Sequence, residues 1–474
     1  MTYISFDFYI FLAILLIVYY SIPLQVRWIA ILAGSVLFYY KICEKGIWIL
    51  LLTIVLSYFA GLLTAYFCQN NKIRKLIVCS FSIILAFVWF VLKGGFNTAS
   101  STWIVPVGIS FYTLQIISYL IDIYKGKINP QRNILKYALY VLFFPQIIQG
   151  PIPRYQQLAS QLYQGHPFQE ERFVRGMQLI LWGFFLKLMI ADKAAVIVNE
   201  IFTKWEIYKG FYFWTAGILY SIELYTDFLA CVTISQGVAG LFGVALADNF
   251  RRPYFAVSIK DFWRRWHISF SGWLRDYIYI PLGGNRKGTF AKYINLVITF
   301  AVSGVWHGNG LQFLVWGLLH AFYQIVGALT NKVRIKLYDI VSLPERSGMR
   351  IIIQRISIFF WVTIAWVIFR AESLEIGLYI IKSMFSVFNP WIFFNDALLK
   401  LGLDWKEWCV LLLSISVLIG IHSKQEKGVC IGDFINSRSV YMRWIIYIAA
   451  IICIMVFGTY GFGYNAQDFI YGGF

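Results

Sequence analysis

Charged residues are scarce in this chain, where Asp, Glu, Lys and Arg together make up 14% of the 474 residues. A soluble domain carries roughly 25% charged residues, and these keep its outer surface in contact with water. Hydrophobic residues reach 59% of the chain. This balance excludes an ordinary water-soluble fold and is typical of a protein whose outer surface faces lipid.

The motifs of several enzyme and metal-site classes are also missing. The sequence contains no Walker phosphate-binding loop, no G-x-S-x-G nucleophile elbow and no HExxH zinc motif. Its seven cysteines are scattered without a CxxC pair, and its five histidines do not complete a set of metal ligands. We therefore expect no metal, no bound cofactor, and cysteines that are reduced and serve packing.

Apolar stretches long enough to cross a bilayer as a helix, which takes about 20 residues, recur along the whole chain. They are continuous rather than alternating, so they predict helices and not the strands of an outer-membrane barrel. Because several are short or interrupted, we expect an all-α polytopic membrane protein with roughly 11–13 transmembrane helices and additional re-entrant or amphipathic helices. The stretches span residues 6–22, 27–42, 47–68, 76–93, 104–122, 134–149, 176–202, 211–246, 291–306, 311–329, 351–370, 376–388, 407–421 and 441–462.

No long polar linker and no soluble domain separates these stretches. One continuous membrane domain over residues 1–474 is the simplest interpretation. The first stretch lacks the basic segment and the small-residue cleavage site of a signal peptide, so we expect it to be retained as a helix.

Basic residues outnumber acidic ones by 41 to 23, which gives a net charge of +18. In a soluble protein this excess would suggest a nucleic acid partner. Here many of the basic residues lie in short loops between apolar stretches, as in Lys72–Lys75 and Lys332–Lys336. The positive-inside rule accounts for such clusters, so we expect these loops to be cytoplasmic and expect no nucleic acid partner.

Residues 247–292 differ from the rest because they are rich in charged and aromatic residues and contain no clean span. Four aromatic residues recur there at helical spacing, and they are Phe262, Trp266, Phe270 and Trp273. The pattern predicts a charged amphipathic helix that lies at the membrane interface or folds back into the protein. The run Pro281–Asn285 should end that helix.

Three of the five histidines fall close together in the sequence, at positions 267, 307 and 320. His320 lies inside an apolar stretch, and ionisable residues at membrane depth tend to mark functional paths. A neutral imidazole there can accept a proton, which makes His320 a candidate general base. The alternative is a histidine that hydrogen-bonds a neighbouring helix. His307, in the crowded turn SGVWHGNG, is expected to shape the site rather than to react.

Other polar groups offer further candidates. Arg264 and Arg265 precede His267, and arginines in such clusters bind phosphate groups, with membrane anchoring as the alternative. Glu223 and Asp227 are four residues apart on one predicted helical face, and Lys187 lies near enough to Asp192 to pair with it. These acids are interpreted as helix-packing groups, although a transporter would use them as an ion path.

Two segments contain all three of the histidines at positions 267, 307 and 320. They are DFWRRWHISFSGWLRDYIYIPLGGNRKG, which begins at residue 261, and SGVWHGNGLQFLVWGLLHA, which begins at residue 303. Both resemble the signature region of the membrane-bound O-acyltransferase family. The resemblance is closest to the bacterial alginate O-acetylation branch and more distant to the D-alanyl teichoic acid export protein. It extends to VPVGISFYTLQIISYLIDIYKG at 105–126, FFPQIIQGPIPRY at 143–155, DNFRRPY at 248–254 and the ending DFIYGGF.

This resemblance implies a ring of helices around a central funnel, with the catalytic histidine at its narrow point and residues 261–320 as the signature block. It places His320 on the family's catalytic histidine and His267 on its second characteristic polar position. The residues expected to line the tunnel or bind the donor are Arg264, Arg265, Trp306, His307 and Asn309. The implied location is the bacterial cytoplasmic (inner) membrane, which the chain crosses several times.

The activity implied is acyl transfer, most simply of acetyl, from a cytoplasmic thioester to the outer face. The donor would be acetyl-CoA or a carrier-protein thioester. The partners implied are an extracytoplasmic SGNH-type acyltransferase, a cell-surface polysaccharide as final acceptor, and membrane lipids. Three alternatives stay open, namely D-alanyl transfer to teichoic acid, a non-enzymatic transporter or flippase in polysaccharide export, and a non-catalytic scaffold.

Overall fold

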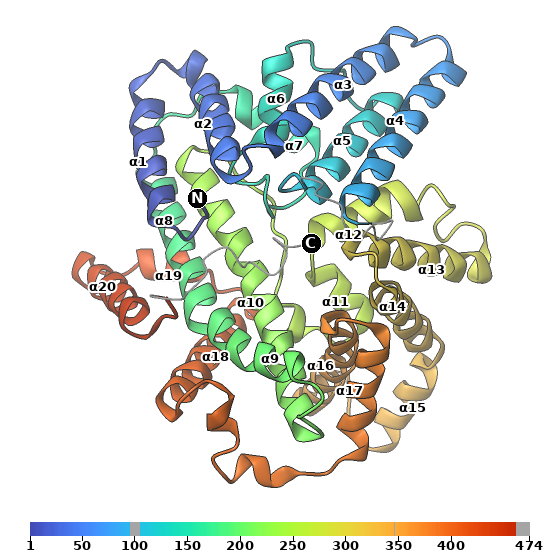
Figure 1. The fold of residues 1–474 in the computed structure, drawn as a ribbon, viewed down its shortest axis with the longest axis vertical. Coiled ribbons are helices and arrows are strands. Elements are labelled where there is room, and N and C mark those ends of the chain that lie inside the picture. The colour runs from blue at the N-terminus through green and yellow to red at the C-terminus, as the bar shows by residue number, and fades with distance from the viewer. Residues whose placement is uncertain (95–104, 346, 461–474) are drawn as a thin grey trace. The chain divides into compact units, whose positions relative to one another are not determined.

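The computed structural model describes residues 1–94, 105–345 and 347–460, and these residues form helices joined by turns and loops, with no strand among them (Figure 1). The predicted all-α architecture is confirmed. Every apolar stretch predicted from the sequence contains a helix. The ending DFIYGGF, which contributes to the family resemblance, lies outside the described residues.

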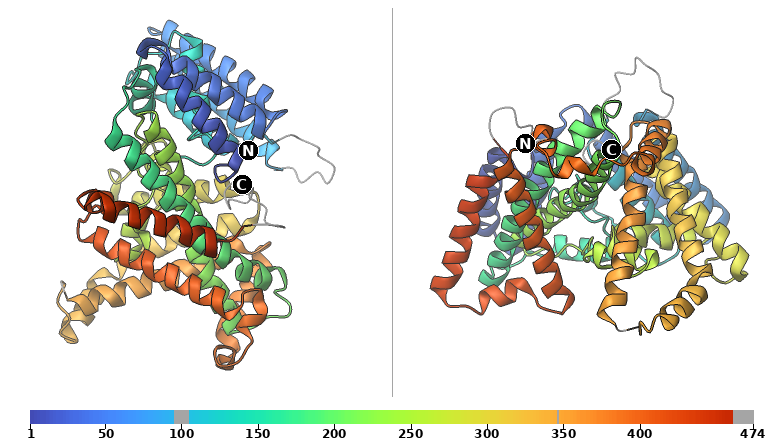
Figure 2. Two further views of the ribbon diagram at one scale, coloured as in Figure 1. Left: turned by 90° about the vertical axis from the view of Figure 1, so that its left-hand side faces the viewer. Right: turned by 90° about the horizontal axis from the view of Figure 1, so that it is seen from below.

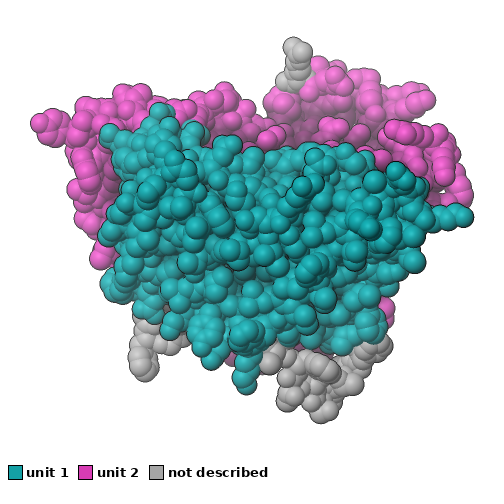
Figure 3. All heavy atoms as spheres, turned by 90° about the horizontal axis from the view of Figure 1, so that it is seen from above, with its two compact units in different colours: residues 1–183, 230–247, 463–474 teal, residues 184–229, 248–462 magenta. Residues whose placement is uncertain are grey.

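The contacts within the chain separate into two compact units (Figure 3). Unit 1 comprises Met1–Gly183 and Ala230–Ala247, and unit 2 comprises Phe184–Leu229 and the described residues from Asp248 onward. One membrane domain over the whole chain stays a prediction, as does a ring of helices with a central funnel.

Unit 1 is built from the helices of the first part of the chain. Within it α3 packs against α4, α5 and α6, and α2 packs against α1 and α6. The hydroxyl of Tyr137 donates to Ser57 Oγ at 2.8 Å and ties α6 to α3. The helices are α1 (Phe6–Ser21), the short 3-10 helix η1 (Leu24–Val26), α2 (Arg27–Ile42), α3 (Gly46–Tyr66), α4 (Asn71–Leu92), α5 (Ile109–Tyr124), α6 (Ile134–Leu142), α7 (Tyr155–Tyr163) and α8 (Glu170–Phe184).

Unit 2 contains most of the remaining helices, which can be followed from two further sides in Figure 2. The stretch 211–246, although long enough for two spans, begins with one helix of 31 residues that contributes to both units. The elements are η2 (Phe185–Ala191), α9 (Asp192–Thr203), α10 (Phe211–Leu241), η3 (Pro253–Phe255), α11 (Ile259–Arg265), α12 (Ile268–Leu274), η4 (Arg275–Tyr279), α13 (Gly288–His307), α14 (Leu311–Leu329), α15 (Asn331–Ile340), α16 (Gly348–Arg370), α17 (Leu374–Ser386), η5 (Pro390–Phe393), η6 (Leu398–Leu401), α18 (Trp405–Glu426), α19 (Ile431–Asn436) and α20 (Val440–Phe457).

Within the described ranges, eight helices are long and apolar enough to cross a membrane, namely α3, α4, α10, α13, α14, α16, α18 and α20. Helices α1 and α5 are apolar but have only 16 residues each. The chain is therefore a multi-pass membrane protein, and the total of roughly 11–13 spans stays a prediction.

Helices α13 and α14 form the closest helix pair of unit 2, and two glycines make this approach possible. A Cβ on Gly304 would collide with the carbonyl oxygen of Phe313, and one on Gly317 would collide with that of Phe300. Small residues of this kind let membrane helices bring their backbones together. The close pairing holds the last turns of α13, which ends at His307, against the first half of α14, the helix that contains His320.

The amphipathic helix predicted from the spacing of Phe262, Trp266, Phe270 and Trp273 forms as two short helices, α11 and α12. Ser258 begins α11 by accepting the backbone N–H of Asp261 at 3.1 Å. The break falls at His267, whose φ of 43° lies in the left-handed region. The predicted end of the helical segment at Pro281–Asn285 is confirmed, because Gly283 and Gly284 turn the chain there with positive φ.

Candidate active site

The predicted site residues all lie in unit 2, and the structure brings four of them into one cluster of packed rings. His320 lies in α14, Trp306 and His307 end α13, and His267 precedes α12. Trp306 packs 6.2 Å from His267, and His307 packs 5.0 Å from Trp316, which in turn packs 5.0 Å from His320 (ring centroids). The predicted residues that lie outside this cluster are Arg264, Arg265 and Asn309.

His320 is fully buried in α14, with 0% of its surface exposed. Aromatic rings surround the imidazole at centroid distances of 5.0 to 6.3 Å, and we call them the aromatic cage. The cage consists of Phe262, Trp263, Phe300, Trp316, Tyr323 and Trp366. None of these side chains carries a charge at neutral pH, so the ring sits in a dry, apolar environment.

One hydrogen bond orients His320 within the aromatic cage. The indole Nε1–H of Trp263 donates to His320 Nδ1 at 3.2 Å. An indole nitrogen can only donate, so Nδ1 must hold a lone pair and the neutral ring must carry its proton on Nε2. In the described part of the chain, nothing accepts a hydrogen bond from this buried Nε2.

His267 is held by a different set of bonds. Asn249 Oδ1 accepts the backbone N–H of Ser269 at 3.1 Å and its hydroxyl at 2.9 Å, and it lies 3.2 Å from His267 Nδ1. A carbonyl oxygen can only accept, so His267 carries its proton on Nδ1 and its lone pair on Nε2. The two histidines therefore adopt opposite tautomers. Burial lowers the pKa of His267 to about 3, which keeps its ring neutral at physiological pH.

The backbone around His267 is fixed by two further hydrogen bonds. Arg251 donates its N–H to the carbonyl of Arg265, and Ile268 donates to the carbonyl of Asn249, each at 2.9 Å. A left-handed conformation is uncommon outside glycine and is maintained only where the surrounding structure holds it. These bonds supply that support and point the imidazole into the ring cluster, against Phe228 at 4.8 Å.

Arg264 and Arg265 differ in their availability for a phosphate. Arg265 donates to Asp261 at 3.1 Å and to Glu426 at 3.0 Å, and Glu426 also accepts from Arg252 at 2.7 Å. Arg265 therefore serves an ion-pair network that ties α11 to the end of α18. Arg264 is exposed to solvent.

A charged cluster is buried elsewhere in unit 2. Lys187 Nζ lies 2.7 Å from Asp227 Oδ1 and 2.9 Å from Asp192 Oδ1, and these three side chains are 3%, 1% and 11% exposed. The predicted pairing of Lys187 with Asp192 is confirmed. Residues five apart do not face each other on an α-helix, but Lys187 lies in η2, a π-helix whose wider turn brings them together. No three His, Cys, Asp or Glu side chains of the described residues gather as a metal site.

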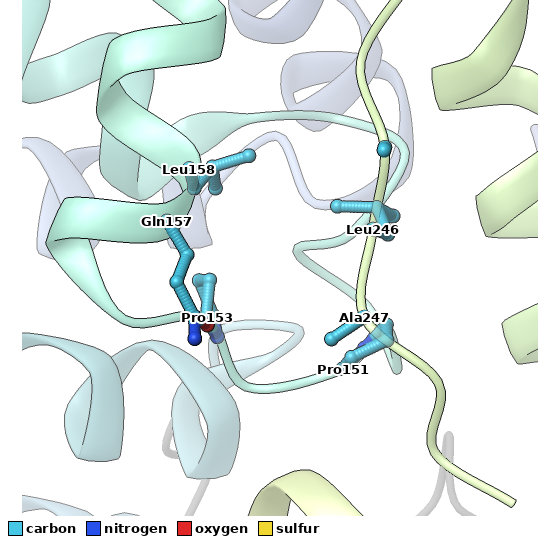
Figure 4. Close-up of a pocket in the computed structure, with 7 residues that line it drawn as sticks. Pro151, Pro153, Gln157, Leu158, Leu246 and Ala247 are labelled. Atoms are coloured by element: carbon cyan, nitrogen blue, oxygen red, sulfur yellow. The ribbon is translucent and has the colours of Figure 1, made fainter.

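Unit 1 contains a pocket of about 220 Å³ (Figure 4). It is lined by the loops around Pro151–Pro153 and Ala245–Ala247 together with α7 residues Gln157 and Leu158. Gln161 holds the second loop, because its side chain bonds both the N–H and the carbonyl of Ala245. The predicted site residues do not line this pocket.

Residues 130–371 match the model of the membrane-bound O-acyltransferase family, MBOAT. This match covers more than half of the chain and includes every predicted site residue.

The chain belongs to this family.

Three curated relatives of this MBOAT protein differ in the acceptor that their names state. A probable alginate O-acetylase of Pseudomonas putida is 37% identical over 292 residues, which are 61% of this chain and 56% of that protein. A peptidoglycan O-acetyltransferase of Helicobacter pylori is 32% identical over 396 residues, 76% of this chain and 70% of that protein. A teichoic acid D-alanyltransferase of Bacillus subtilis is 29% identical over 228 residues, 45% of this chain and 57% of that protein. The chain thus spans little more than half the length of the first and third relatives.

The two residues that hydrogen-bond the histidines of this MBOAT site, Trp263 and Asn249, were not predicted. Both lie inside segments that carry the family resemblance, DFWRRWH and DNFRRPY. Trp263 contacts His320, 57 residues away, and Asn249 contacts His267, 18 residues away. The spacing within either segment does not reveal contacts over such separations. The indole N–H of Trp263 was the available signal, since a buried indole usually finds an acceptor.

Proposed function

We propose that this chain is an O-acyltransferase that moves an acyl group, most simply acetyl, from a cytoplasmic thioester to a hydroxyl acceptor at the outer face of the cytoplasmic membrane. The observation that carries the proposal is His320, a buried imidazole within the family-matched region whose Nε2 has no hydrogen-bond partner among the described residues. Buried polar atoms without a partner are few in native proteins, and one explanation for them is a role in catalysis.

The donor class follows from the chemistry that an uncharged site can perform. A thiol has a pKa of about 8.5, so its thiolate leaves readily and needs no strong acid catalyst. Acetyl-CoA or a carrier-protein thioester therefore suits the aromatic cage, which offers no carboxylate and no cation. Exposed Arg264 is the candidate contact for donor phosphates.

The reaction moves only the acyl group through the protein. Carrying the whole anionic donor through hydrocarbon would be costly, whereas a path that admits the thioester carbonyl to His320 avoids this cost. On the outer face the acceptor is a cell-surface polysaccharide, reached directly or through an extracytoplasmic SGNH-type acyltransferase. The alginate and peptidoglycan acetylases among the relatives support acetyl and a glycan acceptor.

D-alanyl transfer is the second candidate, supported by the Bacillus subtilis relative. An experiment on the purified protein in vesicles distinguishes acetyl transfer from D-alanyl transfer. The protein receives either acetyl-labelled CoA or a D-alanyl carrier-protein thioester, together with glycan and partner acceptor. We expect acetyl label to appear on the acceptor and the D-alanyl thioester to remain intact. Transfer of D-alanine alone would reverse the assignment, and transfer of neither would remove the enzymatic proposal.

A further inference from the structure

The hydrogen bond between Trp263 and His320 restricts what His320 can do. A general base needs a lone pair that faces the substrate, but the lone pair of His320 is on Nδ1 and accepts from the Trp263 indole at 3.2 Å. Moving the proton to Nδ1 would place two donors against each other at that distance. Trp263 is itself 8% exposed and packs at 5.0 Å from Phe300 and 5.9 Å from Trp316, so it has little room to turn away.

The other ring nitrogen has the opposite character. Nε2 carries the proton, is buried, and finds no acceptor in the described part of the chain. A buried N–H without an acceptor is rare in native proteins. At the centre of an acyl-transfer site, the group that would satisfy it is an oxygen atom brought by the substrate.

We propose that Trp263 holds His320 as the Nε2–H tautomer, and that His320 donates this hydrogen bond to the carbonyl oxygen of the thioester instead of taking a proton from the acceptor. Trp263 is then a positioning residue and His320 the catalytic one. The inference rests on the proposed acyl transfer and assigns the part that His320 plays in it. It replaces the general-base role predicted from the sequence.

The step balances without a proton leaving the imidazole. The acceptor oxygen forms a bond to the acyl carbon while the carbonyl oxygen gains negative charge, which the Nε2–H stabilises. The C–S bond then breaks with its electron pair going to sulfur, and the hydroxyl proton of the acceptor ends on that sulfur as a thiol. Donors preset toward a developing oxyanion are worth roughly 10²–10³-fold in kcat.

Two amide variants of His320 distinguish the donor from the base. The side-chain amide nitrogen of Gln lies near the place of Nε2, whereas that of Asn reaches only the place of Nδ1, and neither amide is a base. We expect His320→Gln to keep at least about tenfold more kcat than His320→Asn or His320→Ala, because an amide N–H can serve as an oxyanion donor. Equal loss in all three variants would overturn the donor role, while an inactive wild type would overturn the proposed function instead.

The tautomer itself is read by nitrogen NMR on protein labelled in its histidine rings, with His320 assigned by its loss in His320→Gln. We expect protonated Nε2 and unprotonated Nδ1 in the wild type. Trp263→Phe removes the indole N–H and should shift the tautomer ratio by roughly two- to tenfold, which is the worth of one neutral hydrogen bond. The value of kcat follows the fraction of protein in the Nε2–H tautomer, so it should fall by less than this ratio shifts, while KM for the donor stays constant.

Trp316→Phe is the matched control. Trp316 also packs at 5.0 Å from His320 and is also buried, but its Nε1 makes no hydrogen bond among the described residues. The control removes the same atoms from the aromatic cage and should leave the tautomer unchanged. A wild-type His320 protonated on Nδ1, or an equal shift in both tryptophan variants, would overturn the proposal.

Discussion

Unit 2 buries two polar groups in opposite ways, His320 and the Lys187 cluster. Lys187 reaches two carboxylates, those of Asp227 and Asp192, within 2.9 Å. His320 is surrounded by rings, and only its Nδ1 is bonded while Nε2 has no acceptor among the described residues. Removing one partner of a buried ion pair strongly destabilises a fold, because the remaining charge is left uncompensated. The open Nε2–H of His320 is the donor that we assign to the substrate, so the comparison separates stability from chemistry.

This contrast also bears on the transporter alternative, in which the buried acidic residues would form an ion path. Asp227 and Asp192 both pair with Lys187, whereas Glu223, one helical turn before Asp227, has an oxygen with no hydrogen bond among the described residues. If the contrast holds, activity depends on His320 and stability depends on Lys187.

The largest effect is expected from His320→Ala. Loss of the histidine should reduce acyl transfer by roughly 10²–10⁴-fold, whether it acts as base or as oxyanion donor. The cage rings remain, so the detergent-solubilised protein should elute as a folded species in size-exclusion chromatography. Transfer within a few-fold of wild type would remove His320 from the chemistry.

Lys187→Met should have the opposite profile. The substitution leaves Asp227 and Asp192 buried without their cation, and breaking a buried ion pair costs about 3–5 kcal/mol of folding free energy. The matched control is Lys204→Met, because Lys204 pairs with Glu200 at 2.8 Å but is 52% exposed, and such surface pairs contribute below about 1 kcal/mol. Denaturant titration in bicelles measures both variants.

The transfer rate per folded molecule decides what the Lys187 variant means. We expect this rate to stay near the wild-type value in Lys187→Met. A variant that is folded but inactive would give the charged cluster a role in function and remove the contrast with His320.

His267 should make the fold sensitive to acid. Its folded pKa of about 3 lies below the unfolded value of about 6.5, so the unfolded chain binds the proton more readily. The contribution of His267 is therefore present above pH 6.5 and is lost as the pH falls toward 3, with about 2 kcal/mol lost by pH 5. His267→Asn should unfold at a melting temperature that changes less between pH 7 and pH 5 than the wild type, and an equal change would contradict a buried neutral ring.

The smallest effect is expected at the two arginines of α11. Arg264→Gln should raise KM for the donor about fivefold without changing kcat, as the loss of one exposed phosphate contact would. Arg265→Gln should leave this KM unchanged and lower stability slightly, because Arg265 bonds Asp261 and Glu426. Steady-state kinetics at varied donor concentration tests both variants. A higher KM in Arg265→Gln alone would assign the donor contact to Arg265 instead of Arg264.

Much of the fold followed from the sequence because bilayer-spanning helices need long apolar runs, and each such run contains a helix here. The kink at His267 did not follow, because aromatic spacing from Phe262 to Trp273 continues across it. Backbone bonds from Asn249 and Arg251, which are distant in the sequence, impose that break.

The site residues followed from local pattern and family resemblance, but their hydrogen bonds did not. The sequence places His320 in an apolar helix, yet only the position of the Trp263 indole fixes its tautomer. Likewise the sequence alone does not distinguish Arg264 from Arg265. The fold does, because it places Glu426 beside Arg265. Contacts between residues that are distant in the sequence thus determine the roles of these side chains, and the local sequence pattern does not reveal them.

The central claim is that the acyl group, and not its donor, crosses this protein at His320. Wild-type protein and His320→Ala are placed in vesicles with outer-face acceptor, and CoA labelled either in its acetyl group or in its adenine is supplied on the cytoplasmic side. The account predicts that acetyl label reaches the far side with wild type only, while adenine label stays behind with both. Adenine label that crosses as fast as acetyl label, or acetyl label that crosses in His320→Ala, would contradict it.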